Sequence, residues 1–503
     1  MNPQTFTLYD LLVRNAATFG DRTALVTETG ETLDFRALLH RVDALAGGLS
    51  SRGLGRGDRI CVLAQNSAAF FELYLACAKN GHTAYPINWR WSIDEIERIL
   101  ERANAKAFLV DEETSDKVPT AVGEDNSLLL RGQIGGDGLE GYEALESIYD
   151  EAVAASPEVE ASDPFTVIAT AAVDVIPRGA VLTHANVLAS SSQQIAAMGL
   201  GADDCNLLAL PLYHIAGLGN ALAIFQAGGA NVLMRRFDAS AAVELIDRHR
   251  ITFLSDFPPI LTNVLDAAKE AGSRLASLRI VSGLDAPDTM NRLHEETGAD
   301  FWTGFGQTET SGFVSFQRVK DNPGCAGKPG SLSRVILVDD DDVEVPAETP
   351  GEILVRGPIV FEGYDAQPDV TEHTFRNGWH HTGDVGRFDA EGNLYYVKRK
   401  PEKELIKPGG ENVYPAEVET TIMEIEGVTA VCVFGVPDKK WGEGIKAVIE
   451  TDSATLTLES VREHVGNRIA RFKRPQHVEL TDALPRADDD SIDRDAVKER
   501  WGS

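Results

Sequence analysis

Short apolar runs alternate with amphipathic stretches along residues 8–281, and this alternation most constrains the fold. Residues 8–21, 36–52 and 68–79 have the apolar spacing of helices. Apolar runs of strand length occupy residues 60–63, 107–110, 205–209, 230–234 and 278–281. Strands that alternate with helices usually pair in parallel, because each helix carries the chain back to the start of the next strand. The pattern therefore predicts an α/β fold of stacked layers with largely parallel strands.

The pattern changes in the last third of the chain. Residues 324–397 contain short alternating strands separated by turn signals, which predicts a small β-rich subdomain. After it, helical spacing at 416–425 and 458–470 alternates with strand patterns at 429–435 and 445–450. A chain of 503 residues also exceeds one ordinary core. We therefore predict a large N-terminal domain (1–398), a hinge (399–404) and a smaller C-terminal α/β domain (405–503). The polar stretch 111–162 is interpreted as a surface excursion.

The overall charge and the cysteines exclude several classes of protein. A net charge of −31 would repel a nucleic-acid backbone. Local clusters such as 398–400 and 471–474 could still bind small anions. No apolar run approaches the ~18 residues of a membrane span, and the N-terminus lacks the pattern of a signal peptide. Five scattered cysteines without metal spacing favour a reduced cytoplasm.

Three short blocks follow one another in the second half of the chain. They are Phe305-Gly-Gln-Thr-Glu-Thr310, Thr382-Gly-Asp384 and Lys407-Pro-Gly-Gly-Glu-Asn-Val-Tyr-Pro-Ala-Glu-Val-Glu419. Gly306 would let the backbone approach a nucleotide closely. Glu309 could hold Mg²⁺, which takes one or two carboxylates together with substrate phosphates. With these blocks the chain resembles the adenylate-forming superfamily, and within it the AMP-forming acid–CoA ligases.

This resemblance spans residues 11–501 and implies ATP, Mg²⁺ and CoA as cofactors. A carboxylic acid and MgATP would give acyl-AMP and pyrophosphate, and CoA would then displace AMP while the small domain rotates between two poses. Thr308, Glu309, His214 and Lys407 would be catalytic, with Glu309 as the metal ligand. Phe305 would stack on adenine, and Asp384 and Arg399 would hold the ribose. The nucleotide-binding set implied by the resemblance is Thr170, Arg178, Gly283, Phe305, Gly306, Asp384 and Arg399.

The resemblance also implies where CoA and the acyl group bind. The loop with Gly409 and Gly410 would line the tunnel for the pantetheine thiol. The CoA nucleotide would lie near Trp441, Phe472, Lys473 and Arg474. The acyl pocket would include Tyr213, Gly217, Phe257 and Gly304. The partner is expected to be a small carboxylic acid or an acyl-CoA, with no nucleic acid and no membrane; the acyl group and the oligomeric state stay open.

Two blocks differ from the pattern of the family. The phosphate loop, which is normally rich in Ser, Thr and Gly, reads Thr170-Ala-Ala-Val-Asp-Val-Ile-Pro-Arg-Gly179. Its valines stiffen the backbone, and Asp174 would repel a triphosphate. Near the C-terminus, Ser491 stands where the family has a lysine that bridges the carboxylate and the α-phosphate. Both altered blocks serve adenylation.

Three hypotheses therefore stay open. The protein could be an acid–CoA ligase with altered phosphate binding. It could instead act on acyl-CoA or acyl-adenylate, by transfer or hydrolysis, without using ATP. It could also be a non-catalytic sensor or a partner subunit of an active relative.

Overall fold

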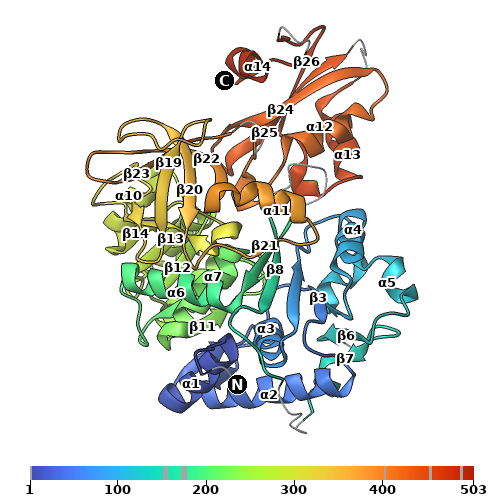
Figure 1. Ribbon diagram of the computed structural model, residues 1–503, viewed down its shortest axis with the longest axis vertical. Coiled ribbons are helices and arrows are strands. Elements are labelled where there is room, and N and C mark those ends of the chain that lie inside the picture. Colours follow the sequence, from blue (N-terminus) through green and yellow to red (C-terminus); the bar gives the residue numbers. More distant parts are fainter. Residues whose placement is uncertain are drawn as a thin grey trace.

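The computed structural model describes residues 3–136, 138–150, 157–170, 178–400, 404–451, 456–487 and 491–502. A large N-terminal domain contains two long sheets, and a smaller C-terminal domain, coloured orange to red in Figure 1, lies above it. This confirms the predicted α/β class with a large and a small domain.

The first long sheet has nine strands in the order β18-β17-β14-β13-β12-β10-β11-β1-β2. Each neighbouring pair among β14, β13, β12, β10, β11 and β1 is parallel, as the alternation predicts. At the two ends of the sheet the pairing is antiparallel: β2 pairs with β1, β17 with β14, and β18 with β17. The strands are β1 (Thr23–Val26), β2 (Thr32–Asp34), β10 (Cys205–Leu208), β11 (Ala230–Leu233), β12 (Phe253–Asp256), β13 (Ile280–Gly283), β14 (Asp300–Thr303), β17 (Ser315–Arg318) and β18 (Lys328–Pro329).

The second long sheet has eight strands in the order β21-β9-β8-β4-β3-β5-β6-β7. Its centre is parallel, and β9 pairs antiparallel with β8. The strands are β3 (Arg59–Leu63), β4 (Thr83–Ile87), β5 (Ala107–Asp111), β6 (Leu130–Ile134), β7 (Glu143–Ala144), β8 (Pro164–Thr170), β9 (Arg178–Thr183) and β21 (Gly363–Tyr364).

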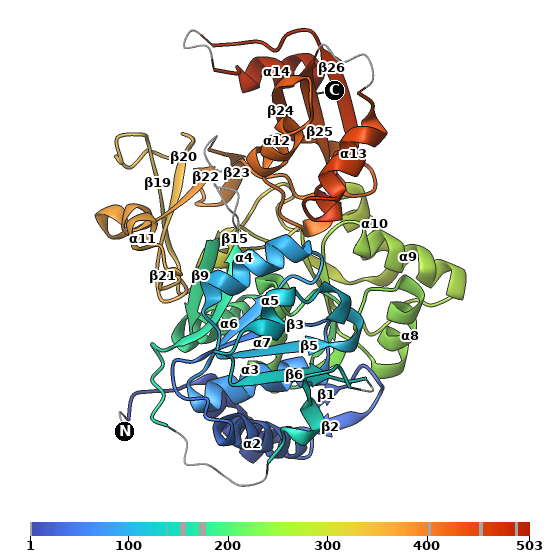
Figure 2. The ribbon, with the colours of Figure 1, turned by 90° about the vertical axis from the view of Figure 1, so that its right-hand side faces the viewer.

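Helices fill the space between the two sheets and cover their outer faces. One apolar cluster joins strands of both sheets to α1 (Leu8–Phe19), α2 (Phe35–Ser51), α3 (Ala68–Asn80), α6 (His184–Met198) and α7 (Ile215–Ala227). The outer face of the nine-stranded sheet packs against α8 (Ala239–His249), α9 (Ile260–Ala271) and α10 (Pro287–Thr297). The outer face of the eight-stranded sheet packs against α4 (Ile93–Ala103) and α5 (Thr120–Glu124). In Figure 2, α8 and α9 lie at the right of the large domain, and α4 and α5 lie nearer its centre.

Smaller sheets complete the two domains. A four-stranded antiparallel sheet contains β19 (Arg334–Val338), β20 (Gly351–Arg356), β22 (His380–Phe388) and β23 (Leu394–Arg399), with α11 (Pro368–Thr374) beside it. The pair β15 (Gly306–Gln307) and β16 (Gly312–Phe313) encloses a short turn. The C-terminal domain has a three-stranded sheet of β24 (Val428–Asp438), β25 (Gly442–Thr451) and β26 (His477–Thr481), packed with α12 (Pro415–Met423), α13 (Leu458–Gly466) and α14 (Arg494–Trp501).

Two parts of the predicted organisation differ from the structure. The stretch 111–162 is more than a surface excursion, because β6 extends the eight-stranded sheet in parallel with β5 and is largely buried. Arg131 and Gln133 interrupt the apolar pattern of β6, so the sequence does not predict a strand there. The strand expected at 278–281 lies at 280–283. The hinge proposed at 399–404 includes residues 401–403, which lie outside the described residues.

Candidate active site

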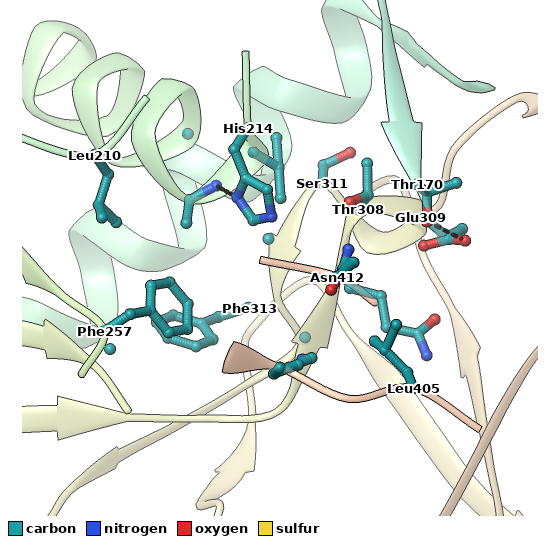
Figure 3. A pocket seen from close by; sticks show the side chains of 18 of the residues that line it. Thr170, Leu210, His214, Phe257, Thr308, Glu309, Ser311, Phe313, Leu405 and Asn412 are labelled. Carbon is teal, nitrogen blue, oxygen red and sulfur yellow. Dashed lines mark hydrogen bonds between the residues drawn. The ribbon is translucent and has the colours of Figure 1, made fainter. Parts of the chain in front are cut away.

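A cavity of about 160 Å³ lies where the two long sheets, the four-stranded sheet and the C-terminal domain meet. We call it the central pocket, and Figure 3 shows its lining from close by. Of the residues predicted from sequence, it brings together Thr170, Arg178, His214, Phe257, Gly283, Gly306, Thr308, Glu309, Arg399 and Lys407. These residues come from strands and loops far apart in the chain, so only the tertiary fold places them side by side.

Glu309 lies at one end of the central pocket and is almost fully buried. The hydroxyls of Thr170 and Tyr364 both donate to its Oε1, each at 2.9 Å. Among the described residues no hydrogen bond reaches its Oε2, so this oxygen can accept a cation. The guanidinium of Arg178 lies 5.3 Å from the centre of the Tyr364 ring. A carboxylate, a cation and hydroxyls therefore line one end of the pocket, a set that suits a metal–phosphate group.

Arg399 lines the pocket, whereas Asp384 lies behind it. Asp384 is about 1% exposed, and its Oδ1 lies 3.0 Å from the Nε of Arg399. Gln307 and Tyr396 also donate to the Asp384 carboxylate. The ribose contact predicted for Asp384 is therefore not supported by its position here. In this arrangement the carboxylate orients Arg399 and Gln307, both of which reach the pocket.

Lys407 enters the central pocket from the C-terminal domain. The loop that carries it is fixed because its backbone N–H donates to Glu443 at 2.6 Å and Ile406 packs in the apolar core of that domain. Desolvation by the pocket walls, followed by the charge of Arg399, lowers the pKa of Lys407 to about 8. Solvent still reaches the side chain through the open pocket. Lys407 can therefore present either a cation or a neutral amine near neutral pH.

His214 caps the N-terminus of α7 and lines the same pocket. Its Nδ1 accepts the N–H of Ala216 at 3.1 Å, so the ring proton is on Nε2. Burial lowers the pKa of His214, which keeps the ring neutral. In Figure 3 the ring lies between the apolar side chains Leu210 and Phe257 and the polar end with Thr308. His214 is thus a neutral donor at the middle of the pocket.

A second cavity, of about 300 Å³, shares Leu210, His214 and Phe257 with the central pocket. We call it the side pocket. Its lining includes the cationic residues Arg90, Arg235, Arg236 and Lys440 and the aromatic residues Trp89 and Trp441. Arg90 pairs with Glu411 and Arg235 with Asp111. Arg236 and Lys440 form no ion pair among the described residues, so in a chain with a net charge of −31 these two cations provide a local site for an anion.

The twin glycines predicted to line a tunnel do line the side pocket. Gly409 has φ +59°, and a Cβ there would lie 3.0 Å from the Trp441 ring. Gly410 has φ +84°, and its Cβ would lie 3.0 Å from Phe257. Both positions combine a left-handed backbone with close aromatic neighbours, so larger residues would be strained. The glycines let the loop pass tightly between the two domains.

Lys473 was expected near a CoA nucleotide, but the structure gives it other partners. Its ammonium bonds to Glu417 of α12 at 2.7 Å and to Glu95 of α4 in the large domain. All three side chains are buried. Burial alone would lower the pKa of Lys473, but the two carboxylates outweigh it and raise the pKa. We call Glu95, Lys473 and Glu417 the latch, because it joins the two domains.

Other predicted residues lie outside the central pocket. Phe305 packs in the apolar core beside the four-stranded sheet, which does not support a stacking role. Gly217 and Gly304 approach neighbouring backbone so closely that an added Cβ would lie 2.2 Å from the Pro211 oxygen and 2.0 Å from the Ser315 oxygen. Tyr213 lines the side pocket. Phe472 and Arg474 flank Lys473 and line neither pocket; Phe472 packs against apolar clusters of both domains.

Several lining residues were missed by sequence reasoning. Tyr364 and Tyr414 line the central pocket, and Tyr364 donates to Glu309. Asn412 and Leu405 enter from the same loop as Lys407. Arg90 and Glu411 form a contact between the domains at 3.0 Å. The block 407–419 contains Asn412 and Tyr414 and could have signalled them, whereas Tyr364 has no local pattern that indicates a site.

The two altered blocks are only partly described. Residues 171–177 of the phosphate loop, including Asp174, lie outside the described residues, as do Asp488, Asp489 and Asp490. Ser491 belongs to a turn of the C-terminal domain, where its carbonyl accepts the N–H of Ala487 at 2.8 Å, and it does not line the central pocket. Among the described residues, no helix is both long and apolar enough to cross a membrane.

Comparison with known proteins agrees with this geometry. The profile of the AMP-binding enzyme family matches residues 12–365, and that of the AMP-binding enzyme C-terminal domain matches residues 417–488. The chain therefore belongs to the AMP-binding enzyme family.

Similar proteins of this family cover nearly the whole chain. A feruloyl-CoA synthase from Amycolatopsis sp is 32% identical over 95% of this chain and 96% of that protein. The long-chain-fatty-acid–CoA ligase FadD13 of Mycobacterium tuberculosis is 30% identical over 98% of both chains. The structure of o-succinylbenzoate CoA synthetase from Bacillus subtilis, solved with a product analogue, superimposes with a TM-score of 0.82 at 27% identity and covers 98% of this chain and 99% of that one.

Proposed function

We propose that this protein is an AMP-forming acid–CoA ligase, which joins a carboxylic acid to CoA through an acyl-adenylate. One observation carries the proposal: the central pocket, with a polar end suited to a nucleotide, shares three wall residues with the cationic side pocket. A nucleotide-linked acyl group in the first pocket would thus lie beside a thiol that arrives through the second. The CoA-ligase relatives support this hypothesis and give no support to the ATP-independent or non-catalytic alternatives.

In the first step, an oxygen of the carboxylate attacks the α-phosphorus of ATP, and the bond to pyrophosphate breaks. Arg178, Thr170 and Thr308 are placed at the polar end, where they would hold phosphate oxygens. The second oxygen of Glu309 fits Mg²⁺ at the same end. When bound there, the metal would neutralise phosphate charge. Arg399 would contact the nucleotide sugar.

In the second step, the sulfur of CoA attacks the carbonyl carbon, the bond to the AMP oxygen breaks, and the thiol proton is released. Lys407 would stabilise the AMP phosphate as it leaves, because its ammonium extends into the central pocket from the C-terminal side. His214, a neutral ring between the pockets, would donate from Nε2 to the carbonyl or the carboxylate. Arg236 and Lys440 of the side pocket would bind the phosphates of CoA.

The proposal is tested by turnover with MgATP, CoA and a panel of acids. Pyrophosphate and AMP should form in equal amounts with the thioester, and omitting CoA should leave only slow pyrophosphate release. Calorimetry with MgATP and with a CoA ester separates the alternatives. Binding of the CoA ester without MgATP, together with no pyrophosphate from any acid, would show that the protein does not use ATP. No turnover of any acid or thioester would favour a non-catalytic role.

A further inference from the structure

The central pocket has a wall of polar side chains in addition to its apolar end. Leu210, Ile215, Phe257 and Phe313 line this end, and Figure 3 shows Leu210, Phe257 and Phe313 gathered on the side of His214 away from Glu309. The same cavity is also lined by Gln194, Asn220 and Ser282, three polar side chains that are each less than 10% exposed. A pocket for a purely hydrocarbon acid needs no such groups, because burying them is unfavourable unless they are hydrogen-bonded.

Hydrogen bonds connect this wall across three elements, α6, α7 and β12. Gln194 of α6 donates from Nε2 to Oδ1 of Asn220 on α7 at 2.6 Å. Asn220 donates from Nδ2 to the hydroxyl of Ser255 on β12 at 2.8 Å. The wall is therefore rigid up to Ser255, with each amide held in one orientation.

Ser282 is the next residue of the wall, and its hydroxyl differs from Ser255 in its hydrogen bonding. Ser255 and Ser282 are register partners on the adjacent parallel strands β12 and β13, so their side chains lie on the same face of the sheet. Yet Ser282 Oγ, in a residue that is 1% exposed, has no hydrogen-bond partner among the described residues. A buried hydroxyl without a partner is destabilising. A group of the bound substrate can supply the missing bond.

We propose that the acid substrate carries a hydrogen-bonding oxygen, such as a hydroxyl, at the end away from its carboxylate, and that this oxygen bonds to Ser282. This inference rests on the proposed function and names the substrate class of the same pocket. The apolar side chains would hold the body of the acid, while Ser282 and the Gln194–Asn220 pair recognise its far end. A site built around a hydrogen bond discriminates strongly against the analogue that lacks it, because its own polar group is then left unpaired.

The test uses paired acids that differ only in the distal hydroxyl: 3-(4-hydroxyphenyl)propanoate with 3-phenylpropanoate, and 8-hydroxyoctanoate with octanoate. The wild-type protein should prefer the hydroxylated acid of at least one pair in kcat/KM. Ser282→Ala should lower that preference about 10-fold to 100-fold, mainly by reducing turnover of the hydroxylated acid. Ser192→Ala, which removes an exposed hydroxyl on the solvent side of α6, is the matched control and should leave the preference unchanged.

A second measurement excludes a merely structural role for Ser282. Because Ser282→Ala removes an unpaired buried hydroxyl, the ligand-free variant should melt at the same temperature as the wild type or roughly 1–3 °C higher. The inference is overturned if wild type uses both acids of each pair equally, or if Ser282→Ala slows both members of a pair alike.

The failure of the proposed function would look different. In that case no acid would release pyrophosphate from MgATP. Calorimetric binding of the paired acids to the wild type and to Ser282→Ala would then decide the inference, since a loss of preference in binding supports it and equal binding of both acids overturns it.

Discussion

Two of the regions where the C-terminal domain contacts the large domain each contain a lysine, Lys407 in one and Lys473 in the other. Lys407 extends into the central pocket, has no carboxylate ion-pair partner within the described residues, and has a pKa lowered to about 8. Lys473 lies between Glu95 and Glu417, and its pKa is raised. The residue type is the same, but the first lysine has spare bonding capacity for a ligand and the second is satisfied by the protein. The difference separates a site residue from a structural one.

The largest effect is expected from Lys473→Met. It leaves the carboxylates of Glu95 and Glu417 buried without their cation, and loss of one member of such a group typically destabilises by about 3–5 kcal/mol. Denaturant unfolding followed by circular dichroism would measure this change. Lys407→Met is the matched control in the same domain and should change the free energy of unfolding little. Equal stability of the Lys473 variant and the wild type would show that the latch does not stabilise the protein.

A large effect on catalysis, without one on stability, is expected from Lys407→Met. Removing a preorganised charge from a reacting phosphate typically reduces the rate about 10²-fold to 10³-fold. Rapid-mixing measurement of thioester formation from preformed acyl-AMP and CoA would isolate this step, with unfolding recorded in parallel. If the variant transfers the acyl group at the wild-type rate, Lys407 has no part in the reaction.

The pH dependence sharpens the contrast between the two lysines. The pKa of Lys407 is lowered to about 8, so its ammonium is present below that pH and is lost as the pH rises through it. We expect acyl transfer to fall up to tenfold per pH unit above about 8. Lys407→Arg should keep its charge and move the fall to higher pH, because the guanidinium stays protonated. An identical profile for both proteins would contradict the assignment of this titration to Lys407.

The smallest effect is expected from Glu411→Gln. Glu411 pairs with Arg90 at 3.0 Å across the domains, but both side chains are partly exposed, 21% and 35%. Partly exposed pairs contribute about 0.2–1 kcal/mol. The glutamine oxygen can still accept from Arg90, while the hydrogen bond that Asn88 donates to the other oxygen is lost. Denaturant unfolding of Glu411→Gln and of Lys473→Met, measured under the same conditions, would compare the stability that an exposed contact and a buried contact between the same domains contribute. If Glu411→Gln lowers the free energy of unfolding as much as Lys473→Met does, burial does not decide how much each ion pair contributes to stability.

Much of the fold could be predicted because it depends on periodicity. The helices near residues 8–19, 35–51 and 68–80 and the parallel strands between them follow apolar spacing that local sequence records. Strand β6 was missed because its edge-side position tolerates Arg131 and Gln133, which weaken the pattern.

The site could be predicted in part. Glu309, Arg399 and Lys407 lie in recognisable blocks and reach the pocket. Phe305 lies in the same kind of block but faces an apolar core, because one residue of register decides which side of a strand or turn a side chain faces.

The amino-acid sequence by itself determined the family, the order of its blocks and the layered α/β arrangement, since these depend on local spacing and residue type. Tertiary structure alone decided which charged groups neutralise one another. Glu95 and Lys473 are separated by 378 residues yet form one buried ion pair, while Lys407 stays available to a ligand. The physical reason is that the pKa and bonding of a buried charge depend on its neighbours in space, which no local pattern of residues contains.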